Sequence, residues 1–146
     1  MRKERRMIMD TKMYTALPQE AKDIRIEVFM KEQGFENEFD DIDNISFHIV
    51  VFDEEKPIGT CRFFKENDHY TIGRVAVLKA YRNQHIGNLL LISAEKEIKK
   101  LNGDLIVVHA QVRVSPFYEK QGYIQFGQID DDEGVPHMWM KKRIQH

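Results

Sequence analysis

The chain lacks most features that mark specialised classes of protein. Its one cysteine, Cys61, excludes an internal disulfide, and no spacing of cysteine and histidine matches a zinc site. The chain contains 22 Lys and Arg residues and 24 Asp and Glu residues, so it lacks the basic excess typical of nucleic-acid binders. No apolar run approaches the roughly 20 residues that a bilayer-spanning helix needs, and the N-terminus has no secretory signal. We therefore expect a cytoplasmic protein with no metal, nucleic-acid or membrane partner.

What is present suits one globular domain. The 146 residues are 42% hydrophobic, enough to bury a sizeable core, and no Pro/Gly/Ser-rich linker or internal repeat divides them. We predict a single domain over residues 1–146, with residues 1–6 as a flexible basic tail.

The hydrophobic spacing alternates between the periods of strands and helices. Pro18 suits the first position of a helix and Gly34 closes it, which predicts a helix over residues 18–33, and a second long helix spans residues 87–101. Ser115 is predicted to cap a short third helix that ends at Gly122. The predicted strands are residues 7–15, 48–52, 58–64, 70–78, 105–110, 123–129 and 135–140. This order indicates an α/β (α+β) fold, with a mixed, mostly antiparallel central sheet of about six to seven strands flanked by helices.

The junction between the strand over residues 70–78 and the following helix carries the clearest chemical signal. The strand ends at Leu78, a short loop carries Arg82, and the helix begins near Gly87. Such a junction directs unpaired backbone N–H groups and the positive end of the helix dipole at one point, which favours a phosphate. Neither a Walker loop nor a dinucleotide-binding glycine pattern is present, so the site belongs to another class.

These residues resemble the GNAT superfamily of acyl-CoA-dependent N-acyltransferases. Residues 82–87, Arg-Asn-Gln-His-Ile-Gly, match the family's phosphate loop Arg/Gln-x-x-Gly-x-Gly/Ala, except that His85 stands where glycine is usual. Residues 115–123, Ser-Pro-Phe-Tyr-Glu-Lys-Gln-Gly-Tyr, are similar to the segment that carries the family's general-acid tyrosine. Residues 28–34, 109–111 and 136–140 add further likeness, so that the resemblance covers about residues 20–142.

The resemblance implies a GNAT-like fold and acetyl-CoA as cosubstrate. Tyr118 would protonate the leaving thiolate, and backbone groups of Val75 and Val77 would bind the pantetheine arm or polarise the thioester carbonyl. The residues implied in cofactor binding are Val75, Ala76, Val77, Arg82, Asn83, Gln84, His85, Ile86, Gly87, Asn88, Ser115 and Phe117.

The acceptor and the catalytic base are less well marked. A primary amine has a pKa of about 10.4, so transfer to it needs a base or a desolvated acceptor. Glu32, at the end of the first helix, is our candidate base because the family's acceptor cleft would lie there. His48, His109 and His137 each suit either a hydrogen-bonded core position or the acceptor pocket. The acidic residues between 36 and 43 (Glu36, Glu38, Asp40, Asp41 and Asp43) are expected in an exposed loop, where they either are simply solvated or attract a cationic acceptor.

Together these features predict an N-acetyltransferase that acts by direct attack of a primary amine in a ternary complex. The acceptor would be a small molecule or a peptide, and Cys61 is expected in the core rather than as a nucleophile. The alternative is a non-catalytic acyl-CoA-binding or sensing module on the same fold. The exposed final strands also suggest a homodimer.

Overall fold

The computed structural model describes residues 7–145, and the predicted tail over residues 1–6 lies outside this range. The strands are β1 (Met9–Tyr14), β2 (Phe47–Asp53), β3 (Lys56–Glu66), β4 (His69–Val77), β5 (Leu105–Gln111), β6 (Ile124–Asp132) and β7 (Val135–Arg143). The α-helices are α1 (Gln19–Arg25), α2 (Ile86–Lys100) and α3 (Ser115–Lys120). A π-helical turn, η1 (Ile26–Glu32), continues α1, and short 3-10 turns are η2 (Asp41–Ile45), η3 (Lys79–Tyr81) and η4 (Val112–Val114).

The strands form one seven-stranded sheet in the order β1-β2-β3-β4-β5-β7-β6. Every neighbouring pair is antiparallel except β4 and β5, which run parallel because α2 connects them as a crossover. The predicted fold class, a mixed and mostly antiparallel sheet flanked by helices, is therefore confirmed.

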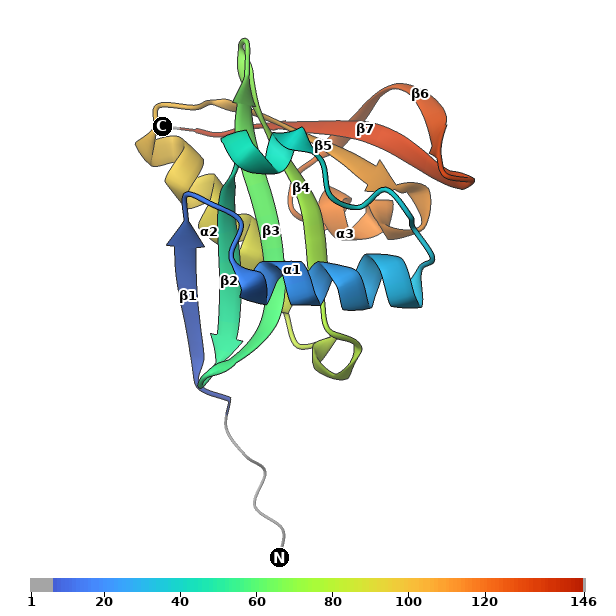
Figure 1. The fold of residues 1–146 in the computed structure, drawn as a ribbon. Coiled ribbons are helices and arrows are strands. Elements are labelled where there is room, and N and C mark those ends of the chain that lie inside the picture. Colours follow the sequence, from blue (N-terminus) through green and yellow to red (C-terminus); the bar gives the residue numbers. More distant parts are fainter. Residues whose placement is uncertain (1–6, 146) are drawn as a thin grey trace, which may run out of the picture.

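Helices cover the two faces of the sheet (Figure 1). The larger core packs α2 and α3 against one face and includes Phe63, Ile72 and Leu90. The smaller core packs α1 against the other face, where Ile24 and Val28 meet β2 and β4. Figure 1 shows α1 and η1 lying across β3 and β4, while the β6–β7 hairpin extends beyond them. On this face α1 and η1 thus pack against β2 and β4.

The pairing of β4 with β5 is short. It joins residues 70–72 to residues 106–108 and then stops, although both strands continue to Val77 and Gln111. A bulge in β4 accompanies the separation: two residues, Arg74 and Val75, stand opposite Cys61 of β3, and Arg74 adopts a φ of +52°. The two strands thus diverge toward their C-terminal ends, and this opening creates the candidate site.

Two local predictions are wrong. Ser115 does not cap α3; it is the first helical residue, the flanking Val114 makes no side-chain cap, and Ser115 is buried. The acidic residues 36–43 are not all exposed, because Glu38 and Asp43 are only 4% exposed. Arginines from three distant segments neutralise them, as described below.

Candidate active site

A cleft of about 140 Å³ lies where β4 and β5 separate. Residues from β4 and β5 form its two sides, η1 and the following loop form one end, and α3 and the β6–β7 turn complete it. Its lining includes Phe29, Gln33, Glu38, Gly73, Arg74, Val75, His109, Gln111, Tyr118, Glu133 and His137. The π-helical turns of η1 bring Gln33 to the cleft, where its Oε1 accepts a hydrogen bond of 2.8 Å from Gln111 Nε2.

The end of β4 offers backbone hydrogen-bonding groups to this gap. The N–H of Leu78 bonds to the carbonyl of Ile58 on β3 at 2.9 Å. Because hydrogen bonds alternate along an antiparallel pair, the N–H and C=O of Val77 and Val75 point away from β3, whereas those of Ala76 point toward it. The carbonyl of Val77 accepts a hydrogen bond of 3.0 Å from Arg82 Nε. Val75 and Val77 are therefore the residues of β4 whose backbone faces the gap.

The loop before α2 has the conformation of an anion-binding turn. Asn83 and His85 have φ of +63° and +62°, and His85 precedes the first helical residue, Ile86. The left-handed conformation at His85 explains why glycine is usual at this position, because glycine adopts positive φ without steric cost. Histidine can stand there because it tolerates positive φ better than most residues. Among the described residues, no acceptor is found for the backbone N–H groups of residues 83–88. These groups and the helix dipole are thus available to a negatively charged ligand.

Gly87, near the start of α2, lies against Phe117 of α3. A Cβ on Gly87 would lie 3.1 Å from Cζ of Phe117, so a larger residue would push the ring away. Phe117 in turn packs edge-on against Tyr118, with ring centroids 5.0 Å apart. The start of α2 is therefore fitted directly to the helix that carries Tyr118.

Two residues predicted for different roles bind each other. The guanidinium of Arg82 donates to both carboxylate oxygens of Glu32, at 2.5 and 2.8 Å. Hydrogen bonding and attraction to Arg82 lower the pKa of Glu32 below its ordinary value. Glu32 is consequently a poor proton acceptor in this arrangement, and its predicted role as the base stays a prediction. The pair instead links the end of η1 to the loop that precedes α2.

Tyr118 lies on the α2 side of the cleft. Its ring is 8% exposed and packs edge-on against Phe117 and Tyr123. Its hydroxyl has no hydrogen-bond partner among the residues that the structure describes. Burial raises the pKa of Tyr118 well above its ordinary value, so the phenol stays protonated across the physiological range. This is the state that a proton donor requires.

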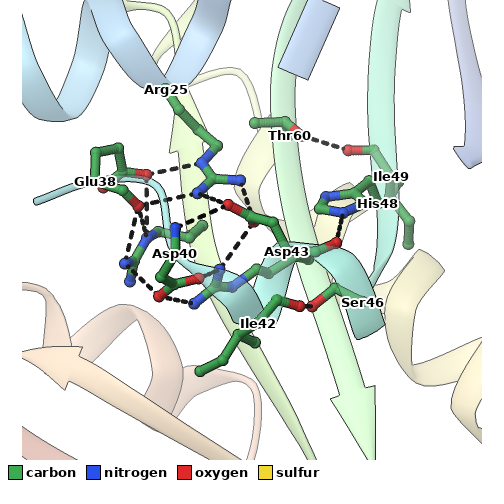
Figure 2. Close-up of polar contacts among 11 residues, drawn as sticks. Arg25, Glu38, Asp40, Ile42, Asp43, Ser46, His48, Ile49 and Thr60 are labelled. Atoms are coloured by element: carbon green, nitrogen blue, oxygen red, sulfur yellow. Dashed lines mark hydrogen bonds and ion pairs between the residues drawn. The ribbon is translucent and has the colours of Figure 1, made fainter. Parts of the chain in front are cut away.

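An ion-pair network (Figure 2) forms one wall of the cleft, where two of its members, Glu38 and Arg74, line it. Arg25, which is 1% exposed, binds Glu38 and Asp43, each at 2.7 Å. Arg62 binds Asp40 at 2.6 Å and Asp43 at 2.9 Å. Arg74 completes the network with a contact of 3.1 Å to Glu38.

Three positive and three negative side chains therefore balance one another in this network. Attraction to Arg25 and Arg62 outweighs burial and lowers the pKa of Asp43 to about 2. For Glu38, burial outweighs its arginine partners and raises the pKa. The network joins α1, the loop before η2, and strands β3 and β4, so it fixes this wall of the cleft.

The three histidines take different places. His48 is a core residue, 1% exposed, and its Nε2 donates to the carbonyl of Asp43 at 3.0 Å. His109 and His137 both line the cleft, with ring centroids 4.7 Å apart. His109 Nε2 lies 2.7 Å from Oδ1 of Asp130. Cys61 is buried in the core, as expected, and burial raises its pKa to about 12.

Comparison with known proteins decides the family. Residues 15–144 match the family model described as Acetyltransferase (GNAT) domain. The chain belongs to the GNAT acetyltransferase family. It is 36% identical over 122 residues to YjcF of Bacillus subtilis (strain 168), named an uncharacterized N-acetyltransferase, covering 82% of this chain and 87% of YjcF.

Solved structures share the GNAT fold. A crystal structure from Lactobacillus plantarum is similar with a TM-score of 0.87 at 28% identity, covering 94% of this chain and 99% of that one. An aminoglycoside 6'-N-acetyltransferase complexed with coenzyme A is similar in fold, with a TM-score of 0.72 at 16% identity over 88% of this chain and 91% of that one. This GNAT chain is thus an acyltransferase, and none of its described helices is long and apolar enough to span a membrane.

Sequence reasoning missed several cleft residues of this GNAT chain. Arg74, Gln33 and Gln111 line the cleft, and Asp130 pairs with His109, yet none of them was singled out. Gln33 and Gln111 lie in segments that resemble the family, and Arg74 follows Gly73 on β4. No local sequence pattern indicates the contacts that these three side chains make. The strand predicted over residues 123–129 continues in β6 through Asp130 to Asp132.

Proposed function

We propose that this protein transfers the acetyl group of acetyl-CoA to a primary amine by direct attack within a ternary complex. The proposal rests on one observation: β4 and β5 diverge beside Tyr118, which lines the cleft, and the loop before α2 lies against the same helix through Gly87 and Phe117. The backbone N–H groups of that loop have no acceptor among the described residues. A ligand with a diphosphate at one end and a thioester at the other would place the diphosphate at these N–H groups and the thioester near the Tyr118 hydroxyl.

The diphosphate of acetyl-CoA would bind to the N–H groups of the loop before α2, namely those of Asn83, Gln84, His85, Ile86, Gly87 and Asn88. Arg82 would add a charged donor, because its guanidinium lies beside this loop. Coenzyme A in the complex of the aminoglycoside 6'-N-acetyltransferase, which shares this fold, supports the cosubstrate. Ser115 and Phe117 would contact the ligand from α3, where Phe117 already packs against Gly87.

The pantetheine arm would run along the separated end of β4. Val75 and Val77 turn their backbone groups toward the gap, while Ala76 lies between them in the strand. An N–H there would polarise the thioester carbonyl and stabilise the oxyanion that forms when the amine attacks. The C–N bond then forms, the C–S bond breaks, and Tyr118 gives its proton to the leaving thiolate.

The second candidate function is an acyl-CoA-binding module without catalysis, which the same diphosphate loop would serve. Tyr118 favours the enzyme, because a buried phenol with no partner has no evident role in ligand binding alone.

The test is release of free CoA thiol when the protein is mixed with acetyl-CoA and a panel of primary amines. Transfer predicts amine-dependent thiol release that matches the acetylated amine found by mass spectrometry. Binding of acetyl-CoA with no thiol release from any amine would favour the binding module.

A further inference from the structure

His109 and Asp130 form a hydrogen-bonded pair at the open face of the cleft. His109 lies on β5 and Asp130 on β6, and β7 runs between them. The imidazole is stacked on Trp139 of β7, with ring centroids 4.3 Å apart and planes at 21°. On the basis of the acetyl transfer proposed above, we propose that His109 accepts the proton of the acceptor amine and that Asp130 positions the imidazole for this step.

The pair fixes which nitrogen of the imidazole is free. The hydrogen bond from His109 lowers the pKa of Asp130, so the carboxylate is ionised at neutral pH and only accepts. In neutral His109 the proton therefore resides on Nε2, which is 2.7 Å from Asp130 Oδ1, and Nδ1 carries the lone pair. No described residue hydrogen-bonds Nδ1. Asp130 would also stabilise the imidazolium that forms, as a carboxylate does for a catalytic histidine.

His109 and Tyr118 approach the cleft from opposite faces of the sheet. Ala110 belongs to the core beneath α2 and α3, together with Tyr118. Because successive side chains of a strand alternate between faces, His109 points to the other side, the side of α1. Both residues line the same cleft. An amine that enters from the open face would meet the proton acceptor there, while the thiolate leaves toward the proton donor.

Three other titratable groups in or near the cleft, Glu32, Glu38 and His137, are less suited to accept this proton. Glu32 is bound by Arg82, and Glu38 lies between Arg25 and Arg74. His137 donates Nδ1–H to the carbonyl of Val135 at 2.9 Å and is 6% exposed. Asp130 attracts His137 electrostatically, but within residues 7–145 the Asp130 carboxylate forms its hydrogen bond with His109 rather than with His137.

Titratable and charged groups from several elements line the cleft around His109. Asp130 comes from β6, His137 from β7, Arg74 from β4, and Arg113 from η4. Three acidic groups complete the cleft: Glu38 from the loop before η2, Asp132 from the end of β6, and Glu133 from the β6–β7 turn.

The proton balance closes. His109 takes one proton from the ammonium form of the acceptor, and the neutral nitrogen then attacks the thioester. Tyr118 supplies the proton that the thiolate takes when the C–S bond breaks, and the second proton lost by the nitrogen returns to the Tyr118 phenolate. The products are the acetamide, CoA thiol and protonated His109, which releases its proton to water.

The decisive variant is His109→Gln, because the amide can keep a donor toward Asp130 but cannot accept a proton at the position of Nδ1. The acceptors are cadaverine, L-lysine amide, tyramine, hydrazine and hydroxylamine, with thiol release as the readout. With the alkylamines we expect kcat to fall by about 10²-fold or more, with acetyl-CoA affinity unchanged. The assays are run at about pH 9, where hydrazine and hydroxylamine, which are much weaker bases, are mostly neutral while the alkylamines are still protonated. With these two acceptors the fall should be less than about 10-fold.

His69→Gln is the matched control. His69 pairs with Asp68 at 3.1 Å in the same manner, but at the β3–β4 hairpin and outside the cleft. Its kcat should equal that of the wild type with every acceptor. In Asp130→Asn, the acidic limb of the kcat profile should move to lower pH, because the imidazolium loses its counter-charge, and kcat should fall by about 10-fold.

The outcomes separate the two claims. A wild type that releases no thiol with any acceptor overturns the proposed function and this inference with it. A wild type that turns over alkylamines while His109→Gln matches it overturns the role of His109 alone. The role of His109 is also overturned if His109→Gln lowers kcat equally for alkylamines and hydrazine. It is overturned as well if the wild type acetylates hydrazine but no alkylamine.

Discussion

Arg82 and Glu32, which are 50 residues apart in the sequence, form a bidentate ion pair beside the loop that precedes α2. The pair joins the end of η1 to the predicted phosphate site. The Glu32 carboxylate therefore already neutralises the guanidinium that would bind the diphosphate of acetyl-CoA.

Arg82→Ala should weaken the binding of acetyl-CoA by about 10- to 100-fold, the range expected for lost charge-assisted hydrogen bonds. Glu32→Gln should bind acetyl-CoA at least as tightly as the wild type, because it removes the carboxylate that competes for Arg82. Isothermal titration calorimetry measures both. Weaker binding in Glu32→Gln, as large as in Arg82→Ala, would mean that Glu32 holds Arg82 in its binding position.

Tyr118→Phe should lower kcat by about 10²-fold and leave acetyl-CoA affinity within about 2-fold. The ring and its packing against Phe117 and Tyr123 are kept, and only the hydroxyl is removed. Because burial raises the pKa of Tyr118, the wild-type rate should show no alkaline fall from ionisation of this group up to pH 10. Steady-state thiol release at several pH values checks both statements, and equal turnover in the two proteins would remove Tyr118 from the mechanism.

His85 tests the conformation of the phosphate loop. His85→Gly should retain acetyl-CoA binding, because glycine adopts the φ of +62° without steric cost. His85→Val should weaken binding and lower the melting temperature, since β-branched residues avoid positive φ. Calorimetry and thermal unfolding of the two variants give the comparison. Loss of binding in His85→Gly would show that the imidazole itself holds the ligand.

Asp43→Asn should lower the free energy of unfolding by about 3 kcal/mol at neutral pH, because Arg25 and Arg62 lose a buried counter-charge. Asp41→Asn, at the exposed neighbouring position, should change it by less than about 0.5 kcal/mol. Urea unfolding measures both. An equal effect of the two substitutions would contradict the account of the network.

The same carboxylate predicts the acid stability of the wild type. The pKa of Asp43 is lowered in the folded protein from 3.8 to about 2. Its contribution is therefore present above pH 4 and is lost as the pH falls from about 4 to about 2, and it amounts to about 2 kcal/mol. The stability difference between the wild type and Asp43→Asn should shrink over this range, and a constant difference would argue against it.

The fold was predictable because its signals are local. The helical spacing around Leu90 and the apolar strand at residues 105–110 each mark an element without reference to the rest of the chain. The burial of Asp43 was not predictable, because the arginines that neutralise it come from α1 and β3. An acidic segment with no neighbouring base indicates an exposed loop unless its distant partners are known.

The candidate site likewise contains residues that the sequence could predict and residues that it could not. The loop around Arg82 was visible as a strand–loop–helix junction, and Tyr118 through its resemblance to the family. The pairing of His109 with Asp130 depends on how β5, β7 and β6 lie side by side, with an irregular register between Phe126 and Asp130. No spacing in the sequence encodes that register, so the partner of His109 emerged only from the structure.

The most direct test of the central claim is a calorimetric titration of the folded protein with acetyl-CoA. The account predicts saturable binding at one site per chain, which Arg82→Ala weakens and Tyr118→Phe does not. Undetectable binding at millimolar acetyl-CoA, from protein shown to be folded by circular dichroism, would contradict it.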